Sequence, residues 1–200
     1  HDVTGLDFDE YMLDKIAPKI KNEKIKWYKA DAIYDDWGTG FDVVVLGANF
    51  LFNIVSYMDY KRAPKLMIQK SASALVIGGH IFVDYAYPQY PEKWFNNPKP
   101  NVVWEGTDSH GIFGKMTLIN NVYDKESRIV RFIRRFDMVL AEGSVLTYEI
   151  PSEKHFAALE QIHRWLEEEG FVMEQECGDY QGHPINKNTN RVIIWAKKVR

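Results

Sequence analysis

The sequence is poor in the features that mark secreted and membrane proteins. It has one cysteine, Cys177, so no internal disulfide can form, which fits a reducing cytoplasm. The longest apolar run, residues 41–55, is interrupted by Asp42 and Asn49 and is too short to cross a bilayer. No signal peptide is visible, and the chain opens at His1 directly on a strand-like run. We therefore expect a cytoplasmic protein without a membrane partner.

The chain also lacks a large excess of one charge. Its 25 Lys and Arg residues and 28 Asp and Glu residues leave a formal net charge of −3. Binding to a nucleic-acid backbone usually needs a basic surface, so a nucleic-acid partner is not expected. Hydrophobic residues make up 46% of the chain, which is enough for the core of one domain spanning residues 1–200.

The first 85 residues alternate strand-like and helix-like segments. Asp9 is the expected cap of a helix whose apolar residues recur at helical spacing, and Pro18 should bend or shorten it. A second helix is expected over residues 60–75, and Gly78-Gly79 should end that unit. This alternation predicts βαβ units. The strand-like segments are residues 1–7, 25–28, 41–46 and 80–84.

The pattern changes after Tyr85. Residues 85–101 are rich in Pro, Tyr, Asn and Trp and are expected to form an ordered loop. The strand-like segments that follow indicate an antiparallel insertion. Ser152 is then expected to cap a helix that Gly170 ends. The strand-like segments of this half are residues 116–122, 129–139, 145–150, 171–177 and 191–197.

Small and polar residues follow the ends of the first strands, where nucleotide-like cofactors bind to open α/β sheets. Asp7 could accept hydrogen bonds from both hydroxyls of a ribose, or it could cap a helix. Asp31 with Ala32 could meet an adenine amino group, or Asp31 could be an ordinary turn acid. Gly47-Ala48-Asn49 could let a ligand approach the backbone, or it could be a plain strand-to-helix turn.

In this order, the segments resemble class I S-adenosylmethionine (SAM)-dependent methyltransferases over nearly the whole chain. The resemblance implies an α/β, Rossmann-like fold with a mostly parallel sheet, a terminal antiparallel hairpin and SAM as cofactor. The family's strand that runs into G-x-G-x-G would lie before His1 and is not in this sequence. The motifs that carry the resemblance are the V-x-G-x-D segment at residues 3–7, Met12-Leu13, Ala30-Asp31-Ala32, Phe41-Asp42-Val43-Val44 and Gly78-Gly79-His80-Ile81.

Within that family, the chain is similar to small-molecule N-methyltransferases such as glycine N-methyltransferase and the amino-sugar N,N-dimethyltransferases. Gly178-Asp179-Tyr180 resembles an element of these enzymes, and the insertion, residues 86–150, would form their substrate lid. Asn49 falls where the glycine enzyme has an asparagine near its substrate. The arginine that holds the glycine carboxylate corresponds to Ala86 here, so glycine is not the substrate that the resemblance implies.

The resemblance also implies a set of cofactor-binding residues. Asp7, with Phe8 beside it, would hold the ribose. Asp31 and Ala32 would flank the adenine, and Gly47 with Ala48 would line the sulfonium pocket. SAM would then lie along the ends of the first three strands.

Asn49, Tyr85 and His183 are the candidate catalytic residues. Methyl transfer is an in-line displacement, which needs the reacting atoms aligned at roughly 3–3.5 Å and water excluded. An amine must only be neutral, so a base is optional, and His183 could serve as one. An aromatic set near the expected substrate mouth could enclose a cationic amine, or it could pack in the core or the lid. Its members are Tyr85, Tyr87, Tyr90, Trp94 and Trp104.

Two further groups of residues bear on metal binding and on anion binding. Only His155 and His163 approach a metal-ligand spacing, so no metal site is expected. Arg128, Arg131, Arg134 and Arg135 divide between the two faces of a strand. They form a solvated edge or contact an anionic substrate.

Other functions stay open beside transfer of a methyl group to a small molecule, most simply to an amine nitrogen. A non-catalytic binding or scaffold chain would explain the missing glycine loop. An NAD-dependent oxidoreductase could use Asp7 equally well, but the antiparallel ending of the chain counts against it. RNA or protein methylation fits the acidic balance and the lid-like insertion less well. We expect a small-molecule substrate, and a homo-oligomer is compatible with the sequence.

Overall fold

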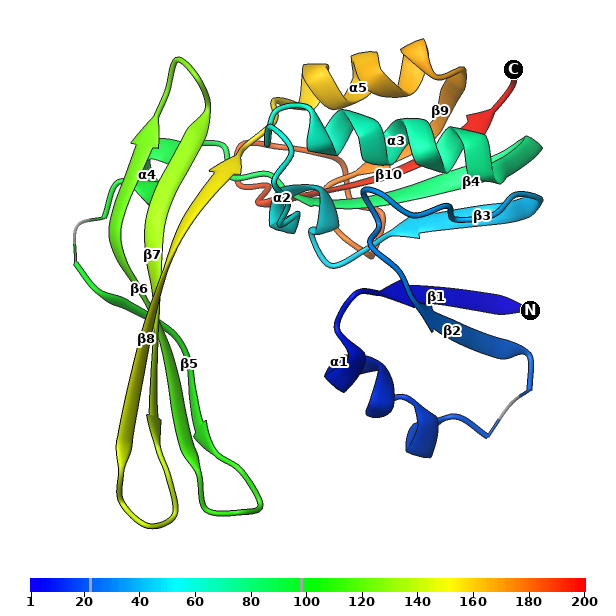
Figure 1. Ribbon diagram of the computed structural model, residues 1–200. Helices are drawn as coiled ribbons and strands as arrows, with labels where there is room; N and C mark the ends of the chain where they lie inside the picture. The colour runs from blue at the N-terminus through cyan, green and yellow to red at the C-terminus, as the bar shows by residue number, and fades with distance from the viewer. Residues whose placement is uncertain (22, 98) are drawn as a thin grey trace.

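The computed structural model describes residues 1–21, 23–97 and 99–200, which form an α/β body and a projecting antiparallel sheet (Figure 1). The body strands are β1 (Val3–Asp7), β2 (Ile25–Lys29), β3 (Phe41–Leu46), β4 (Leu75–Ala86), β9 (Phe171–Cys177) and β10 (Arg191–Lys198). The body helices are α1 (Glu10–Asp14), the 3-10 helix η1 (Ala17–Lys19), α2 (Phe50–Asn53), α3 (Ala63–Ala74) and α5 (Leu159–Glu168). The projecting part holds α4 (Pro91–Phe95), β5 (Asn101–Thr107), β6 (Phe113–Asp124), β7 (Ile129–Val139) and β8 (Val145–His155).

The body strands form two separate sheets. β1 and β2 pair in parallel, while a four-stranded sheet has the order β3-β4-β10-β9. Within it, β3 and β4 are parallel and β10 runs antiparallel to both of its neighbours. The predicted terminal hairpin is therefore confirmed. The sheet is mixed because β10 lies antiparallel between β4 and β9, while β3, β4 and β9 run in the same direction.

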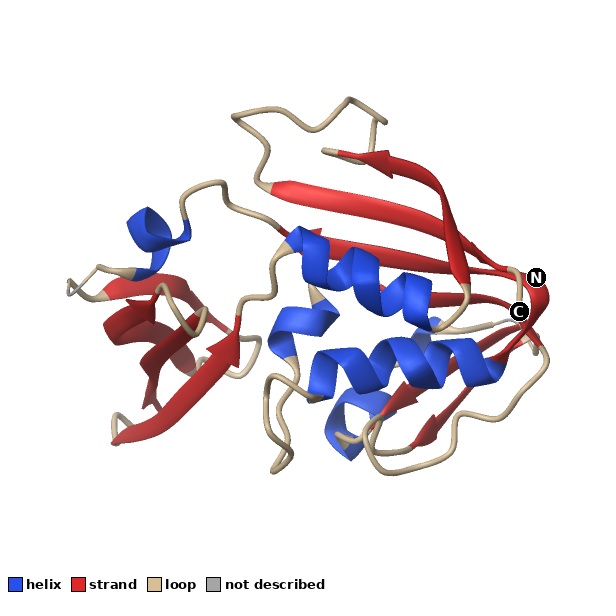
Figure 2. Ribbon diagram, turned by 90° about the horizontal axis from the view of Figure 1, so that it is seen from above, coloured by secondary structure: helices blue, strands red, loops and turns tan. Residues whose placement is uncertain are grey.

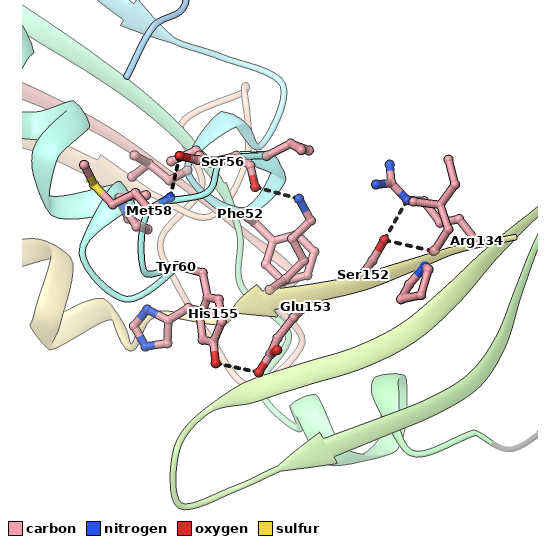
Figure 3. A pocket seen from close by; sticks show the side chains of 16 residues that line it. Phe52, Ser56, Met58, Tyr60, Arg134, Ser152, Glu153 and His155 are labelled. Carbon is pink, nitrogen blue, oxygen red and sulfur yellow. Dashed lines mark hydrogen bonds between the residues drawn. The ribbon is translucent and has the colours of Figure 1, made fainter. Parts of the chain in front are cut away.

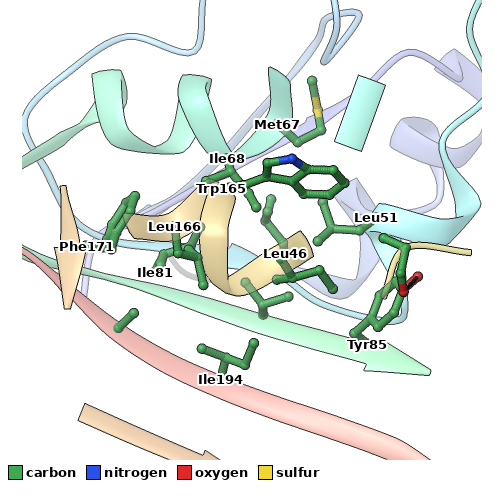
Figure 4. Packing of buried hydrophobic residues seen from close by; sticks show 14 of the residues in the cluster. Leu46, Leu51, Met67, Ile68, Ile81, Tyr85, Trp165, Leu166, Phe171 and Ile194 are labelled. Atoms are coloured by element: carbon green, nitrogen blue, oxygen red, sulfur yellow. Dashed lines mark hydrogen bonds between the residues drawn. The ribbon is translucent and has the colours of Figure 1, made fainter. Parts of the chain in front are cut away.

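Helices α3 and α5 lie across one face of the four-stranded sheet (Figure 2). Their apolar side chains meet Ile81 of β4 and Ile194 of β10, both with no exposed surface (Figure 4). Full burial of one such side chain contributes about 1.5–3 kcal/mol. This core fixes the strands whose ends form the candidate site. Among the described residues, the longest helix is α3 with 12 residues, and none has the length and hydropathy of a membrane span.

The sequence predicted several local features of the body correctly. The Asp9 carboxylate caps α1 by accepting hydrogen bonds from the backbone N–H groups of Tyr11 and Met12. Pro18 lies at the start of η1, so the predicted helix is broken there. Gly78 and Gly79 form an irregularity inside β4 rather than preceding it. Gly78 has a φ of 87°, which a glycine adopts without strain.

The insertion differs from the prediction in three places. Helix α4 and strand β5 were not predicted, because both are short and exposed. Strand β8 continues to His155, so Ser152 lies in a strand opposite Phe132 instead of capping α5. The pairing with β7 satisfies backbone groups that a helix start at this point would leave unpaired. The N-cap of α5 is Ala158.

The far half of the antiparallel sheet has one apolar and one polar face. On the polar face, Arg135 pairs with Asp137, whose carboxylate also accepts a hydrogen bond from the Thr147 hydroxyl. The two views place this sheet on the side of the body toward which β3 and β4 run (Figures 1 and 2). The cross-strand register puts Trp104, Met116, Phe136, Met138, Leu146, Tyr148 and Ile150 together on the apolar face.

Candidate active site

The carboxyl ends of β1, β3 and β4 point toward the antiparallel sheet (Figure 1). Parallel strands bring the residues that follow them to one edge, so short polar segments from distant parts of the sequence collect there. The loop between β9 and β10, residues 178–190, reaches the same edge, because Tyr180 contacts the end of β4. This edge is the candidate active site.

A strained turn follows β3. Ala48 and Asn49 have φ angles of 53° and 59°, so two successive non-glycine residues adopt the left-handed conformation. Each such residue costs about 1–3 kcal/mol unless its surroundings hold it, and this strain is common at functional sites. The turn is held by the neighbouring strand. The Ala48 N–H donates to Asp84 Oδ2 (3.0 Å), and the Ala86 N–H donates to Asn49 Oδ1 (3.0 Å).

Asp84 is the centre of this arrangement. It is 1% exposed, and its carboxylate is ion-paired with Arg191 at the start of β10. The Tyr180 hydroxyl donates to Asp84 Oδ2 at 2.6 Å. A buried carboxylate needs such partners, because an unpaired charge away from water is costly. The hydrogen bond to Asp84 raises the pKa of Tyr180, so Tyr180 keeps its proton and acts as a donor.

The loop at residues 178–190 adds an imidazole–carboxylate pair. His183 Nδ1 lies 2.7 Å from Asp179 Oδ2, and the His183 side chain is 69% exposed. Hydrogen bonds from the side chain and backbone of His183 lower the pKa of Asp179, which favours its ionised form. Tyr180, His183 and Arg191 all line an open cavity of about 370 Å³. The second ring nitrogen of His183 has no partner among the described residues.

The residues expected to bind the nucleoside lie on the β1–β2 side of the edge. One carboxylate oxygen of Asp7 accepts from the Asp9 N–H (2.9 Å), and the other has no partner within the described chain. Phe8 is 66% exposed. Asp31 Oδ1 accepts from the Ile33 N–H (2.7 Å), which is a turn contact. The Ala32 carbonyl is taken by the Trp37 indole N–H (3.0 Å).

Tyr85 lies in the core rather than in the open part of the edge. Its side chain has no exposed surface, and its hydroxyl donates to the Ala157 carbonyl at 3.2 Å. Burial raises the pKa of Tyr85 strongly. In this conformation a substrate cannot reach its hydroxyl. Strand alternation explains the placement, because Asp84 and Tyr85 point to opposite faces of β4.

The other aromatic candidates do not form one cluster. Tyr87 is partly buried and stacks on Phe156 with ring centroids 6.5 Å apart. Tyr90 and Trp94 are more than half exposed around α4. Trp104 is 57% exposed and lies over Gly114, where an added Cβ would come within 2.7 Å of the indole ring. Trp104 therefore belongs to the apolar face of the antiparallel sheet.

Sequence reasoning did not assign Arg191, Tyr180 or Asp179 to the site. Gly178-Asp179-Tyr180 was noticed as a motif, but its pairing with Asp84 spans 96 residues between Tyr180 and Asp84. No local pattern marked Arg191. Within the described chain, no three His, Cys, Asp or Glu side chains lie close enough together to hold a metal ion. His163 instead contacts Glu176 at 2.5 Å.

Comparison with solved structures shows that the chain has the fold of SAM-dependent methyltransferases. The CcbJ methyltransferase of Streptomyces caelestis is similar over 100% of this chain and 75% of its own, with a TM-score of 0.74 and 14% identity. A SAM-dependent methyltransferase of Clostridium acetobutylicum matches over 99% and 75%, with a TM-score of 0.70 and 15% identity. A sugar N-methyltransferase of Streptoalloteichus matches over 98% and 71%, with a TM-score of 0.68 and 14% identity.

Comparisons of the sequence with protein families and with curated proteins found no match. Identities of 14–15% show the fold but not the reaction. The reaction must therefore be argued from the residues of the site.

Proposed function

We propose that this chain forms the larger part of an enzyme that transfers a methyl group from SAM to a small molecule, at an amine nitrogen. The observation that carries the proposal is the strained Ala48–Asn49 turn, held by Asp84 at the carboxyl edge of the sheet. Ligands of open α/β sheets bind at this edge. Sugar N-methyltransferases are among the proteins with the same fold, which supports an amine as acceptor.

The residues near β1 fit the nucleoside part of SAM. One carboxylate oxygen of Asp7 has no partner among the described residues and could accept from ribose hydroxyls, and a hydrogen bond to an ionised group contributes about 1.5–3 kcal/mol. The exposed ring of Phe8 lies next to Asp7 in the chain and offers an apolar surface. Asp31 and Ala32 follow β2, and we assign them to the adenine side. SAM supplies an electrophilic methyl group when it is bound.

Gly47 and Ala48 form the surface along which the methyl group would be presented. Small side chains let a ligand approach the backbone closely. Because Asp84 and Asn49 fix the turn from both sides, its geometry is set before a ligand arrives. A preset geometry reduces the entropy that alignment of the reacting atoms would cost. The Asn49 side-chain N–H₂ group has no acceptor among the described residues and could donate to a substrate.

His183 is the residue best placed to accept a proton from an ammonium substrate. Asp179 holds Nδ1, so the pair orients the ring with its other nitrogen free. A histidine held by a carboxylate is a common general base. The attacking amine must be neutral, and His183 would remove the proton of an ammonium group. This base lies in the loop at residues 178–190, apart from the Gly47–Ala48 turn that would face the sulfonium.

The antiparallel sheet is proposed to cover the substrate. It stands opposite the carboxyl edge (Figure 1). Arg134, Ile150 and Ser152, which share the register of its apolar face, line a cavity against α2. That face is therefore turned toward the body at its near end. Apolar side chains above the edge would exclude water from the reaction.

A glycine-rich loop for the methionine end of SAM is the remaining element of the proposal. Among the described residues, β1 and β3 each have one hydrogen-bonded neighbour and belong to different sheets. We propose that a strand ending in such a loop pairs with these two free edges. Its backbone amides would then bind the carboxylate of SAM.

Calorimetric titration with SAM and S-adenosylhomocysteine tests this proposal. The proteins are residues 1–200, a chimera with a strand and glycine-rich loop placed before His1, and the chimera with Asp7→Ala. We expect the chimera to bind both ligands and Asp7→Ala to weaken binding by about 10–100-fold, since charge-assisted hydrogen bonds are lost. Asp14→Ala, an exposed acid of α1, is the matched control.

The outcomes separate the candidate functions. Unchanged affinity after Asp7→Ala would remove the ribose assignment. A folded chimera that binds neither ligand would contradict methyl transfer and favour a non-catalytic chain of the same fold.

A further inference from the structure

A second cavity, of about 250 Å³, lies at the joint between the body and the antiparallel sheet (Figure 3). One wall is α2 with the segment that follows it, and the other is formed by β7 and β8. In the proposed methyl transfer this cavity only marks where the covering sheet meets α2, and its charged residues have no role in the reaction. The polar side chains that line it include Ser56, Tyr60, Arg134, Ser152, Lys154 and His155.

Lys154 brings a buried positive charge to this cavity. The residue is 6% exposed, and its ammonium donates to the carbonyls of Asn53 (3.2 Å) and Ile54 (2.7 Å). An ammonium has three N–H donors, so one remains. No carboxylate of the described residues pairs with it. Burial and the charge of Arg134 lower the pKa of Lys154 to about 8.

Arg134 of β7 adds a second positive charge on the same wall as Lys154 of β8. Its Nε donates to Ser152 Oγ at 2.8 Å, which fixes the guanidinium plane. Its terminal nitrogens have no partner within the described chain. A fixed guanidinium binds carboxylate and phosphate oxygens in a bidentate manner.

The acid that lines the cavity does not neutralise these two cations. Glu153 Oε1 accepts from the Tyr60 hydroxyl (2.5 Å) and from Arg131 (2.6 Å). Arg131 therefore balances the charge of Glu153. His155 is 4% exposed, and its Nδ1 is buried without a partner among the described residues. Among the described residues, the cavity thus combines two cations that no carboxylate neutralises with one unpaired ring nitrogen.

We propose that this cavity is a binding site for a small anion, a carboxylate or phosphate group, held by Arg134 and Lys154 with His155 at its rim. A volume of about 250 Å³ suits a group of this size and is below the usual range for a whole drug-sized ligand. An anion would supply the countercharge that Lys154 and Arg134 lack.

The cavity is connected to the candidate active site through α2. The Asn53 carbonyl accepts from Lys154, and the Asn53 side-chain amide donates to the Ala48 carbonyl at 3.4 Å. Ala48 belongs to the strained turn. An anionic group in this cavity would therefore lie one short helix away from the edge where a substrate is expected, although the anion site itself does not depend on methyl transfer.

The test is a titration of the intact chain with inorganic phosphate, acetate and glucosamine 6-phosphate. Binding is monitored by NMR chemical shifts at constant ionic strength. We expect saturable shifts of residues around the cavity, and about tenfold weaker binding after Arg134→Gln. Arg135→Gln is the matched control, because Arg135 is the next residue of β7, points to the opposite face and is paired with Asp137. Arg134→Lys should bind the anion more weakly than the parent but more tightly than Arg134→Gln, since the charge is kept while the bidentate contact is lost.

Two sources of the anion are distinguished by the same titrations. Tighter binding of glucosamine 6-phosphate than of phosphate supports an anionic group carried by an amine substrate, and equal binding supports a free anion. If none of the three probes shows saturable binding, the proposal is overturned. Binding that Arg134→Gln and Lys154→Gln both leave unchanged, in variants with the circular dichroism of the parent, overturns it as well.

Discussion

In the body, α3 and α5 cover one face of the four-stranded sheet, whereas the antiparallel sheet keeps side chains exposed on both faces. Ile194 of β10 has no exposed surface, and Ile150 of β8 is 46% exposed. The same residue type in a strand therefore contributes very differently to stability. What matters is the layer that covers the strand, because burial of apolar surface provides most of the folding free energy.

Matched isoleucine substitutions test this difference directly. Ile194→Ala should lower the free energy of unfolding by about 2–5 kcal/mol, since it leaves a cavity in a closed core. Ile150→Ala should lower it by about 1 kcal/mol or less. Chemical denaturation of both variants measures the two losses. A loss at Ile150 as large as that at Ile194 would show that the apolar face of the sheet is covered in solution, for example by a second copy of the chain.

Matched aspartate substitutions extend the comparison to charge. Asp84→Ala should lower the free energy of unfolding by about 2–4 kcal/mol, because Arg191 and the Ala48 N–H lose their buried acceptor while Arg191 keeps some access to water. Asp137→Ala, on the polar face of the sheet, should have a much smaller effect, since Arg135 and Thr147 can turn to water. Urea titrations of the two variants are the measurement.

Equal losses of unfolding free energy in the Asp84 and Asp137 variants would mean that the contacts of Asp84 with the Ala48 N–H and Arg191 do not stabilise the body. Tyr180→Phe separates the contributions, because it removes the hydroxyl contact and keeps the ion pair with Arg191. The loss of unfolding free energy in Tyr180→Phe should lie between the losses in Asp84→Ala and Asp137→Ala.

A third experiment addresses the joint between the two regions, where His155 is buried. Burial, together with the charges of Lys61 and Arg128, lowers the pKa of His155 to about 4 from 6.5. The unfolded chain therefore takes up the proton first as the pH falls. The contribution of neutral His155 to the free energy of unfolding is fully present above about pH 6.5 and is lost as the pH falls toward 4. The loss between these two pH values is about 2–3 kcal/mol.

His155→Gln removes this titration. The difference in unfolding free energy between pH 6.5 and pH 4 should be smaller in the variant than in the parent by that amount, and measurement of both proteins at pH 8 is the control. The same pH dependence in both proteins would show that His155 is accessible to protons at the joint.

The sequence predicted the local structure of the body better than that of the insertion. Strand residues 41–46, the Asp9 cap and the break at Pro18 all depend on neighbours in sequence, and the structure confirms them. Strand β5 and helix α4 had no periodic apolar face to reveal them. Ser152 has the residue type of a helix cap, but strand pairing with β7 decided its conformation.

The sequence could indicate the edge of the sheet at which the candidate site lies. Asp7, Asp31 and Gly47 follow strands, so their common edge could be inferred from the alternation of elements. The sequence suggested that Tyr85 contacts the substrate, but its side chain is buried in the core. The sequence could not show this, because burial of a strand residue depends on which face of the sheet the helices cover. His183 lies where a base could act, but that role stays a prediction.

The sequence by itself determined the order and type of most elements, because periodicity, caps and glycine turns act over a few residues. Only the tertiary structure decided which distant groups meet. Asp84 and Arg191 are 107 positions apart, and Lys154 and Asn53 are 101 apart. Such contacts arise only when the strands have assembled, since neither partner carries a local signal of the other. The strained turn and the positively charged cavity are both products of that assembly.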